Sequence, residues 1–246
     1  MPAVMKYSVN RGSTSFFVTS PLPCPYLDGQ VERRLVAELK GGGDDISLHD
    51  TLSRVGFRRS HGIVYAPICP SCSACLAVRT VVGEFKPSAS QKRVIRINKD
   101  IVVNKRPALA THEQYALFVK YQESRHRGGD MATMDYYDYQ ALIEETTVNT
   151  FILEYRDLDH LVGACIVDEM ADGLSAVYSF FDPTNKSKSL GTQIIMALFE
   201  LALQYRLPHV YLGYWISGSQ KMSYKEKFQP LGYYNGNEWT RSNLIQ

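Results

Sequence analysis

Four cysteines are the residues of this sequence best suited to binding a metal. Cys69, Cys72 and Cys75 form a CxxCxxC run, and Cys24 lies upstream in the segment LPCPYLDG. This spacing lets three thiolates converge on one ion, and a fourth can complete a zinc site or hold an iron–sulfur cluster. The alternative interpretation is a set of small buried residues near the start of a strand. Cys165 lies inside an apolar run and is expected in the core.

A polar loop at residues 184–189 has the composition of an anion-binding loop. It contains two lysines and leads into Leu190 and Gly191, where the sequence predicts the start of a long amphipathic helix. The first N–H groups of a helix and its dipole attract a phosphate or a developing oxyanion. Ordinary helix capping by Ser187 or Ser189 explains the same pattern.

Positive charge gathers in one stretch, although the net charge of the chain is only +2. Clustered lysine and arginine side chains are typical of phosphate binding, and a solvated helix face is the alternative. The stretch contains a single acid, Asp100, and these basic residues: Lys86, Lys92, Arg93, Arg96, Lys99, Lys105 and Arg106.

Aromatic and basic residues alternate near the C-terminus, in the run LGYWISGSQKMSYKEKFQPLG. Tyr214, Trp215 and Tyr224 interleave there with lysines that include Lys221 and Lys225. Stacking surfaces beside positive charge suit unpaired nucleotides. The alternative for Tyr214 and Trp215 is that they pack at the end of a strand.

A second basic group, Arg125, His126 and Arg127, precedes two glycines in the segment YQESRHRGGDM. Cations at this place complement the C-terminal dipole of a helix. They also suit a pocket for an acidic side chain, because arginine binds carboxylates in bidentate geometry. The residue types alone do not separate the two interpretations.

The first hundred residues must position the cysteines and the basic stretch. Residues 29–41 have a helix-like pattern closed by three glycines, and residues 62–68 and 76–85 are predicted strands. Ser88 or Ser90 is a suitable N-cap for a helix that carries the basic face. The sequence therefore predicts a small, loop-rich α+β module that contains the cysteines.

The second half shows a regular order of elements. Thr111 and Gln114 have capping-box spacing, with Tyr115, Phe118 and Val119 on one helix face. A strand, a helix and a further strand after the meander form a right-handed βαβ crossover. The predicted helices are 111–126, 134–146, 189–206 and 221–228, and the predicted strands are 149–157, 161–170, 174–183, 209–215 and 232–239. This order is that of N-acyltransferases of the GNAT type, which indicates acyl transfer without identifying the substrate.

Length and composition describe an ordinary folded chain. The 246 residues are 45% hydrophobic and 21% charged, which excludes a disordered or fibrous protein. No apolar stretch is long enough to span a membrane and no export signal is evident, so the cytoplasm is expected and structural disulfides are not. We predict an α+β protein with a cysteine-containing and basic module at 1–106 and a GNAT-like domain with a mixed sheet at 107–246.

Taken together, these segments resemble the bacterial aspartate/glutamate leucyltransferases, which are similar to the eukaryotic arginyl-tRNA–protein transferases. The resemblance covers nearly the whole chain and is carried by CPYLDG, YAPICPSCSACLAVR, FKPSASQKRV, SRHRGGDM, DGLSAVYSFFDP, SLGT and GYWISGSQKMSYKEKFQP. It implies an enzyme that moves leucine from leucyl-tRNA to the α-amine of proteins with N-terminal Asp or Glu. Such proteins are thereby marked for degradation by the N-degron pathway, and neither DNA nor a membrane is an expected partner.

Three other functions compete with this one. Arginine could be the transferred residue, a choice that only the resemblance decides. An acetyl-CoA-dependent N-acetyltransferase could use the same crossover loop, but it would not need the basic N-terminal half. A non-catalytic, metal-stabilised RNA-binding module accounts for the cysteines and the basic stretch, but it leaves the acyltransferase order unexplained.

The resemblance also bears on the cysteines. Eukaryotic members carry N-terminal cysteines associated with an iron–sulfur cluster, and part of that set corresponds to Cys24 and to the region of Cys69, Cys72 and Cys75. This chain has Leu27 where the second cysteine of the first pair would fall. Acyl transfer itself requires no cofactor, so a zinc ion or a cluster would be structural or regulatory.

Roles for site residues follow from the expected reaction. Asp182 is the candidate for orienting or deprotonating the acceptor amine, with Tyr178 or Tyr214 for the leaving-group proton and Phe180 on the same wall. A turn-forming Asp before a proline is the alternative for Asp182. The candidates for binding aminoacyl-tRNA are Lys92, Arg93, Arg96, Lys188, Ser189, Leu190, Gly191, Lys221, Tyr224 and Lys225. The candidates for binding the acidic acceptor are Arg79, Arg125 and His126.

Overall fold

The computed structural model describes residues 5–9 and 12–241, which form an α+β structure of two compact units. The first unit contains Met1–Thr80 and Leu212–Gln246, and the second contains Val81–Tyr211. This division differs from the predicted boundary at 106/107. The basic stretch belongs to the second unit because its strand pairs there, and the C-terminal strands return to the first. The sequence shows no evident export signal near its N-terminus. Residues 1–4 of that segment lie outside the described residues.

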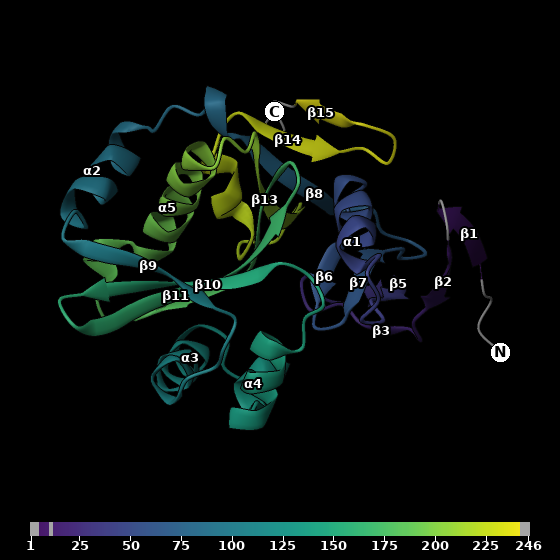
Figure 1. The fold of residues 1–246 in the computed structure, drawn as a ribbon, viewed down its shortest axis with the longest axis horizontal. Helices are drawn as coiled ribbons and strands as arrows, with labels where there is room; N and C mark the ends of the chain where they lie inside the picture. Colours follow the sequence, from purple (N-terminus) through teal and green to yellow (C-terminus); the bar gives the residue numbers. More distant parts are fainter. Residues whose placement is uncertain (1–4, 10–11, 242–246) are drawn as a thin grey trace. The chain divides into compact units, whose positions relative to one another are not determined.

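The first unit contains an antiparallel sheet in the order β1-β2-β5-β7-β6 (Figure 1). A short hairpin of two strands and one helix complete this part of the unit. The elements are β1 (Met5–Val9), β2 (Gly12–Val18), β3 (Leu22–Pro23), β4 (Val31–Glu32), β5 (Arg34–Glu38), α1 (Asp45–Arg54), β6 (Arg58–Ser60) and β7 (Ile63–Pro67).

The helix predicted at residues 29–41 is wrong, because this segment forms β4 and β5. Leu35, Ala37 and Leu39 alternate along the chain, and Ala37 and Leu39 are buried. That period of two matches a strand between two neighbours, and β5 does lie between β2 and β7. The helix of this unit begins only after the glycines, at Asp45.

The C-terminal part of the first unit differs from prediction in two places. Residues 221–228 form a short 3-10 helix, η4 (Ser223–Lys227), instead of an α-helix. Residues 232–239 form a hairpin instead of one strand, because the side chain of Asn235 accepts main-chain N–H groups at a turn. The strands are β8 (Cys75–Val81), β14 (Leu231–Tyr234) and β15 (Trp239–Arg241), in the order β15-β14-β8.

The second unit confirms the predicted meander and crossover. Strands β9 to β12 pair antiparallel in sequence order, and β12 pairs parallel with the first residues of β13, which makes the sheet mixed. Strand β9 was not predicted as a strand. The strands are β9 (Ile101–Pro107), β10 (Thr150–Asp157), β11 (His160–Met170), β12 (Gly173–Phe181) and β13 (His209–Ile216).

Helices cover both faces of this sheet (Figure 1). Helices α3 and α4 pack on one face, where Phe118 and Tyr139 form a buried cluster with Ile166 and Phe180 of the strands. Helix α5 packs on the other face, where the Tyr155 hydroxyl donates to a carbonyl of the helix. The helices are η1 (Val82–Glu84), α2 (Ala89–Ile97), α3 (His112–Arg125), η2 (Asp130–Thr133), α4 (Tyr136–Glu144), η3 (Lys186–Lys188) and α5 (Leu190–Gln204).

Two of the predicted helix caps are present. Ser88 and Gln91 form a capping box at the start of α2, and Thr111 and Gln114 form another at the start of α3. Each box satisfies two main-chain N–H groups that the helix itself leaves without acceptors. Within the described residues, no helix combines the length and apolar character that a membrane span requires.

Candidate active site and thiol pocket

Asp182 follows β12 and is fixed by three contacts to one oxygen. Its Oδ1 accepts hydrogen bonds from the Thr184 main-chain N–H at 2.9 Å and hydroxyl at 2.6 Å, and it lies 2.9 Å from Lys120 Nζ. Burial by itself would raise the pKa of Asp182, but these contacts outweigh it and hold the pKa below its ordinary value. A general base works best with a pKa near the working pH, so the geometry favours orienting the amine over deprotonating it.

The loop after Asp182 leads into α5 without the side-chain cap that its serines suggested. Ser189 has a left-handed backbone (φ 49°) and makes no side-chain cap, and Ser187 bonds to Asn185 instead. Among the described residues, no acceptor contacts the N–H groups of Leu190 and Gly191. These two donors are therefore available to an anion, as the anion-binding interpretation requires.

Gly191 is closely packed against a side chain of β12. A Cβ on this residue would lie 3.0 Å from the ring of Phe181, closer than most side-chain contacts in proteins. Leu190 is only 3% exposed, so its side chain does not contribute to the loop surface. Lys188 forms an ion pair with Asp157 at the end of β10.

Tyr178 and Phe180 belong to the packing of α3 on the sheet. The Tyr178 hydroxyl accepts a hydrogen bond of 2.7 Å from Gln122 Nε2, and its ring packs against Phe118. Phe180 has no exposed surface, so it cannot line a substrate gap as expected. Tyr178 remains a candidate for handling the leaving-group proton.

The acceptor candidates fall in different units. Arg125 and His126 lie at the end of α3, with the Arg125 guanidinium 5.9 Å from the centre of the Phe181 ring. The His126 ring lies 5.5 Å from that of Tyr121. Arg79 is in the first unit, where its guanidinium lies 4.2 Å from the centre of the Trp239 ring. Of these three candidates, Arg125 is the one whose guanidinium lies beside a residue of β12, Phe181.

The basic stretch divides into two kinds of residue. Lys92, Arg93 and Arg96 are exposed on α2, as a phosphate-binding face requires. On β9, Lys105 lies 3.1 Å from Glu169 and Arg106 lies 3.7 Å from Glu154, so both are already paired. The open positive charge of this stretch is therefore concentrated on the helix. The carboxylate partners lie far away in sequence.

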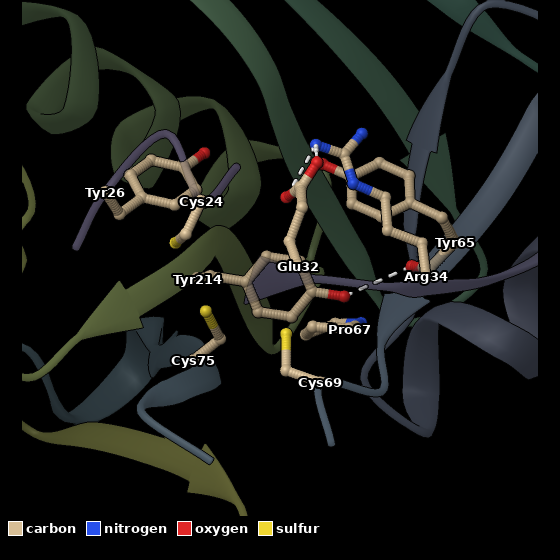
Figure 2. Close-up of a pocket in the computed structure, with 9 residues that line it drawn as sticks. All are labelled: Cys24, Tyr26, Glu32, Arg34, Tyr65, Pro67, Cys69, Cys75 and Tyr214. Carbon is tan, nitrogen blue, oxygen red and sulfur yellow. Dashed lines mark hydrogen bonds and ion pairs between the residues drawn. The ribbon is translucent and has the colours of Figure 1, made fainter. Parts of the chain in front are cut away.

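The sequence-predicted cysteines meet in the first unit. Cys24, Cys69 and Cys75 line one cavity together with Tyr214 (Figure 2). We call this cavity the thiol pocket. Its lining residues are Cys24, Tyr26, Glu32, Arg34, Tyr65, Pro67, Cys69, Cys75 and Tyr214.

Burial in the thiol pocket acts on the thiol of Cys75, and an ion pair holds Arg34. Burial raises the pKa of Cys75 to about 11, and the neighbouring thiols Cys69, Cys24 and Cys72 add to the effect. Arg34 binds the Glu32 carboxylate through two hydrogen bonds of 2.8 and 3.0 Å. The donor types fit zinc or an iron–sulfur cluster. Among the described residues, no group of three Cys, His, Asp or Glu side chains is already gathered as closely as in a formed metal site.

Tyr214 and Lys225 are structural residues of this unit. The Tyr214 hydroxyl lies 2.9 Å from the carbonyl of Gly56 and 3.1 Å from that of Tyr65, and burial raises its pKa. This commits its proton to the main chain and argues against the predicted role as proton donor. Lys225 is a predicted tRNA-binding residue, but it is only 4% exposed and its Nζ donates a hydrogen bond to the Tyr214 carbonyl. A phosphate cannot reach it there.

The other C-terminal candidates are accessible. Lys221 is exposed and Tyr224 is 44% exposed, so both can contact a nucleotide. Trp215 instead donates a 2.7 Å hydrogen bond from Nε1 to Glu226, which agrees with the packing interpretation. The aromatic and basic run is thus partly surface and partly core.

Several residues that organise the site were not identified from the sequence. Lys120 and Gln122 of α3 hold Asp182 and Tyr178. Asn98 is buried at the end of α2 and donates a 2.7 Å hydrogen bond to the Lys188 carbonyl. The helix-end position of Asn98 is readable, but its partner lies 90 residues away, and no local pattern identifies such a partner.

Comparison with known proteins places most of the chain in one family. Residues 22–93 match the family described as arginine-tRNA-protein transferase, N terminus, and residues 113–235 match the corresponding C terminus. An aspartate/glutamate leucyltransferase of Paramagnetospirillum magneticum is 53% identical over 92% of this chain and 93% of its own.

A protein of the same name from Gluconacetobacter diazotrophicus is 49% identical over 96% of this chain and 91% of its own. Among solved structures, FemX aligns over 86% of this chain and 79% of its own, with a TM-score of 0.48 and 7% identity. That likeness is too weak to carry an assignment, whereas the sequence matches are long and strong. The chain belongs to the family of aspartate/glutamate leucyltransferases.

Proposed function

We propose that this protein transfers leucine from leucyl-tRNA to the α-amine of N-terminal Asp or Glu. The observation that carries the proposal is the 53% identity, over nearly the whole chain, to a relative named for this activity. The fixed carboxylate of Asp182 and the open N–H groups after Ser189 add support from the site. The tRNA substrate supports a cytoplasmic location for the proposed reaction, and its proposed products are proteins marked for degradation.

The chemistry asks little of a base. The donor is an ester and the acceptor α-amine has an ordinary pKa of about 7.7–8.0, so part of it is neutral near pH 7. Positioning and stabilisation of the tetrahedral oxyanion then supply most of the rate. Asp182 orients the amine, and the N–H groups of Leu190 and Gly191 face the anion. The C–N bond forms and the ester C–O bond then breaks, and Tyr178 gives its proton to the departing ribose oxygen and takes up the proton that the amine loses.

We also propose that the second unit is of the GNAT type. Its antiparallel meander, the parallel pairing of β12 with β13, and α5 between them support this fold. Arg79, Arg125 and His126 remain candidates for the acceptor, and Lys221 and Tyr224 for the donor.

Three donors separate the competing functions. Leucyl-tRNA, arginyl-tRNA and acetyl-CoA are each incubated with the protein and a peptide that begins with Asp, and the products are weighed by mass spectrometry. Addition of leucine supports the proposal. Addition of arginine or acetyl assigns the alternative function, and no addition from any donor points to a binding module.

Charge reversal on α2 is expected to weaken tRNA binding. The variant carries Lys92→Glu, Arg93→Glu and Arg96→Glu, which removes the open positive face. Each lost phosphate contact lowers the salt dependence of the affinity by about one in log–log slope. Affinity is measured between 50 and 200 mM salt, with Lys105→Glu as a control on the paired strand. An unchanged slope in the triple variant assigns the face to solvent.

We further propose that Cys24, Cys69, Cys72 and Cys75 bind zinc or an iron–sulfur cluster after the thiols move closer together. Elemental analysis and absorption spectra of anaerobically purified protein are expected to show about one site per chain. Cys69→Ser is expected to lose the metal, whereas the matched control Cys165→Ser in the core of the second unit keeps it. Metal-free protein with full stability and activity would remove this proposal.

A further inference from the structure

The second unit contains a cavity beside the crossover loop. The ligand of this cavity has not been assigned. It has a volume of about 340 Å³ and lies between the β10–β11 turn and the start of α5. Six of its nine lining residues are polar or charged: Asp157, His160, Asp182, Thr184, Asn185 and Lys188. A cavity of this composition suits a polar ligand better than an apolar one.

The charges in this cavity are arranged as two ion pairs with one open oxygen. The contacts of Asp182 with Thr184 and Lys120 all involve Oδ1, and within the described part of the chain Oδ2 accepts no hydrogen bond. Lys188 extends its ammonium group to the carboxylate of Asp157. The cavity therefore offers an acceptor for an amine at Asp182 and a cation that already holds a side-chain carboxylate.

We propose that this cavity receives the first residue of the acceptor protein. Asp182 Oδ2 binds the α-amine, and Lys188 exchanges the carboxylate of Asp157 for the carboxylate of the acceptor side chain. Asp157 thus occupies the place of the acidic substrate while the cavity is empty. The inference rests on the proposed function and assigns its acceptor site. This site contains none of Arg79, Arg125 and His126.

The leucyl group is a poorer occupant of the same cavity. Its isobutyl side chain offers no partner to the open Oδ2 of Asp182, and a polar group covered without a partner costs free energy. An acceptor Asp or Glu carries an amine and a carboxylate at the separation of one residue. A neutral Asn or Gln would leave Lys188 without a counter-charge once Asp157 is displaced.

The main chain at Lys188 is held while its side chain exchanges partners. Asn98 is 2% exposed and donates from Nδ2 to the carbonyls of Lys188, at 2.7 Å, and of Val94, at 2.9 Å. This fixes the loop to the end of α2. The ammonium group of Lys188 can then change carboxylates by side-chain rotation, without moving the helix start at Leu190.

Two substitutions with effects of opposite sign test the proposal. Lys188→Gln is expected to lower kcat/KM for an Asp peptide about 10- to 100-fold, mainly through KM, and to reduce the preference for Asp over Asn. Asp157→Asn removes the competing carboxylate and is expected to lower KM for the Asp peptide several-fold. The inference moves Lys188 from the candidates for binding aminoacyl-tRNA to the acceptor site, so both variants are expected to keep the wild-type KM for leucyl-tRNA. Lys186→Gln, an exposed lysine of the same loop outside the cavity lining, is the matched control.

Peptide binding without tRNA, measured by calorimetry, separates this inference from the proposed function. If the wild-type protein binds the Asp peptide but transfers no leucine, the proposed function is wrong and the cavity can still be the peptide-binding site. If the wild-type protein transfers leucine and both variants bind the Asp peptide with wild-type affinity, the assignment of the acceptor to this cavity is wrong. The inference also fails if Lys188→Gln raises KM for leucyl-tRNA alone, or if Arg125→Gln is the variant that loses the preference for Asp.

Discussion

Asp182→Asn is expected to lower kcat/KM for leucine transfer by about a hundredfold, because it removes the charge that positions the acceptor amine. The amide oxygen of Asn can still accept from the N–H and hydroxyl of Thr184, so the turn before α5 is preserved. The loss is therefore expected without a change in thermal midpoint. Steady-state kinetics with an Asp peptide, together with a melting curve, measure both quantities.

The ion pair with Lys120 supplies the control for this prediction. Lys120→Met removes the cation but leaves the carboxylate, and half-exposed ion pairs contribute about 1 kcal/mol or less. If Lys120→Met loses as much activity as Asp182→Asn, the carboxylate acts only by holding α3. The pKa of Asp182 lies below its ordinary value, so the residue stays ionised across the assay range. Activity between pH 6 and 8 is then expected to follow the acceptor amine.

Local sequence patterns correctly predicted the elements whose hydrophobic period and helix-capping residues agree with their packing in the folded protein. The meander and crossover of the second unit have apolar runs of strand length, clear turn residues and one long amphipathic helix, and all of them form. The capping boxes at Ser88 and Thr111 need only residues three apart, so they are readable from the sequence. The helix prediction for residues 29–41 was wrong because glycines after a charged run resemble a helix end. The alternation of apolar and polar side chains in this segment is used only when β2 and β7 pair with β5.

The individual residues of the site could be predicted from the sequence, but the contacts between them could not. The loop at 184–189, Asp182 and the converging cysteines each carry a local signal, and the structure places Cys24, Cys69 and Cys75 in one pocket. The partner of Lys188 lies 31 residues earlier in the chain. Burial of a lysine within a charged run, as at Lys225, depends on which strands cover it, and charge patterns predict the opposite.

Lys225 gives the protein a pH-dependent stability that charge counting would not suggest. Burial lowers the pKa of Lys225 to about 7, and the nearby cation of Arg58 adds to this effect. The unfolded chain, with the ordinary lysine pKa of about 10.4, therefore binds more protons than the folded one between roughly pH 7 and 10. Raising the pH through this window favours the folded state, and lowering it toward 7 removes that contribution.

Lys225→Met keeps the apolar stem in place and abolishes this titration. The unfolding free energy of the wild type, minus that of the variant, is expected to rise by about 1.4 kcal/mol per pH unit within the window. Urea unfolding at several pH values measures it, and both tryptophans, Trp215 and Trp239, report on the unit that contains Lys225. Lys227→Met, at an exposed position in the same 3-10 helix, is expected to show no such slope. A constant difference between wild type and Lys225→Met would mean that the folded protein carries this lysine charged, with its ammonium group stabilised by the Tyr214 carbonyl.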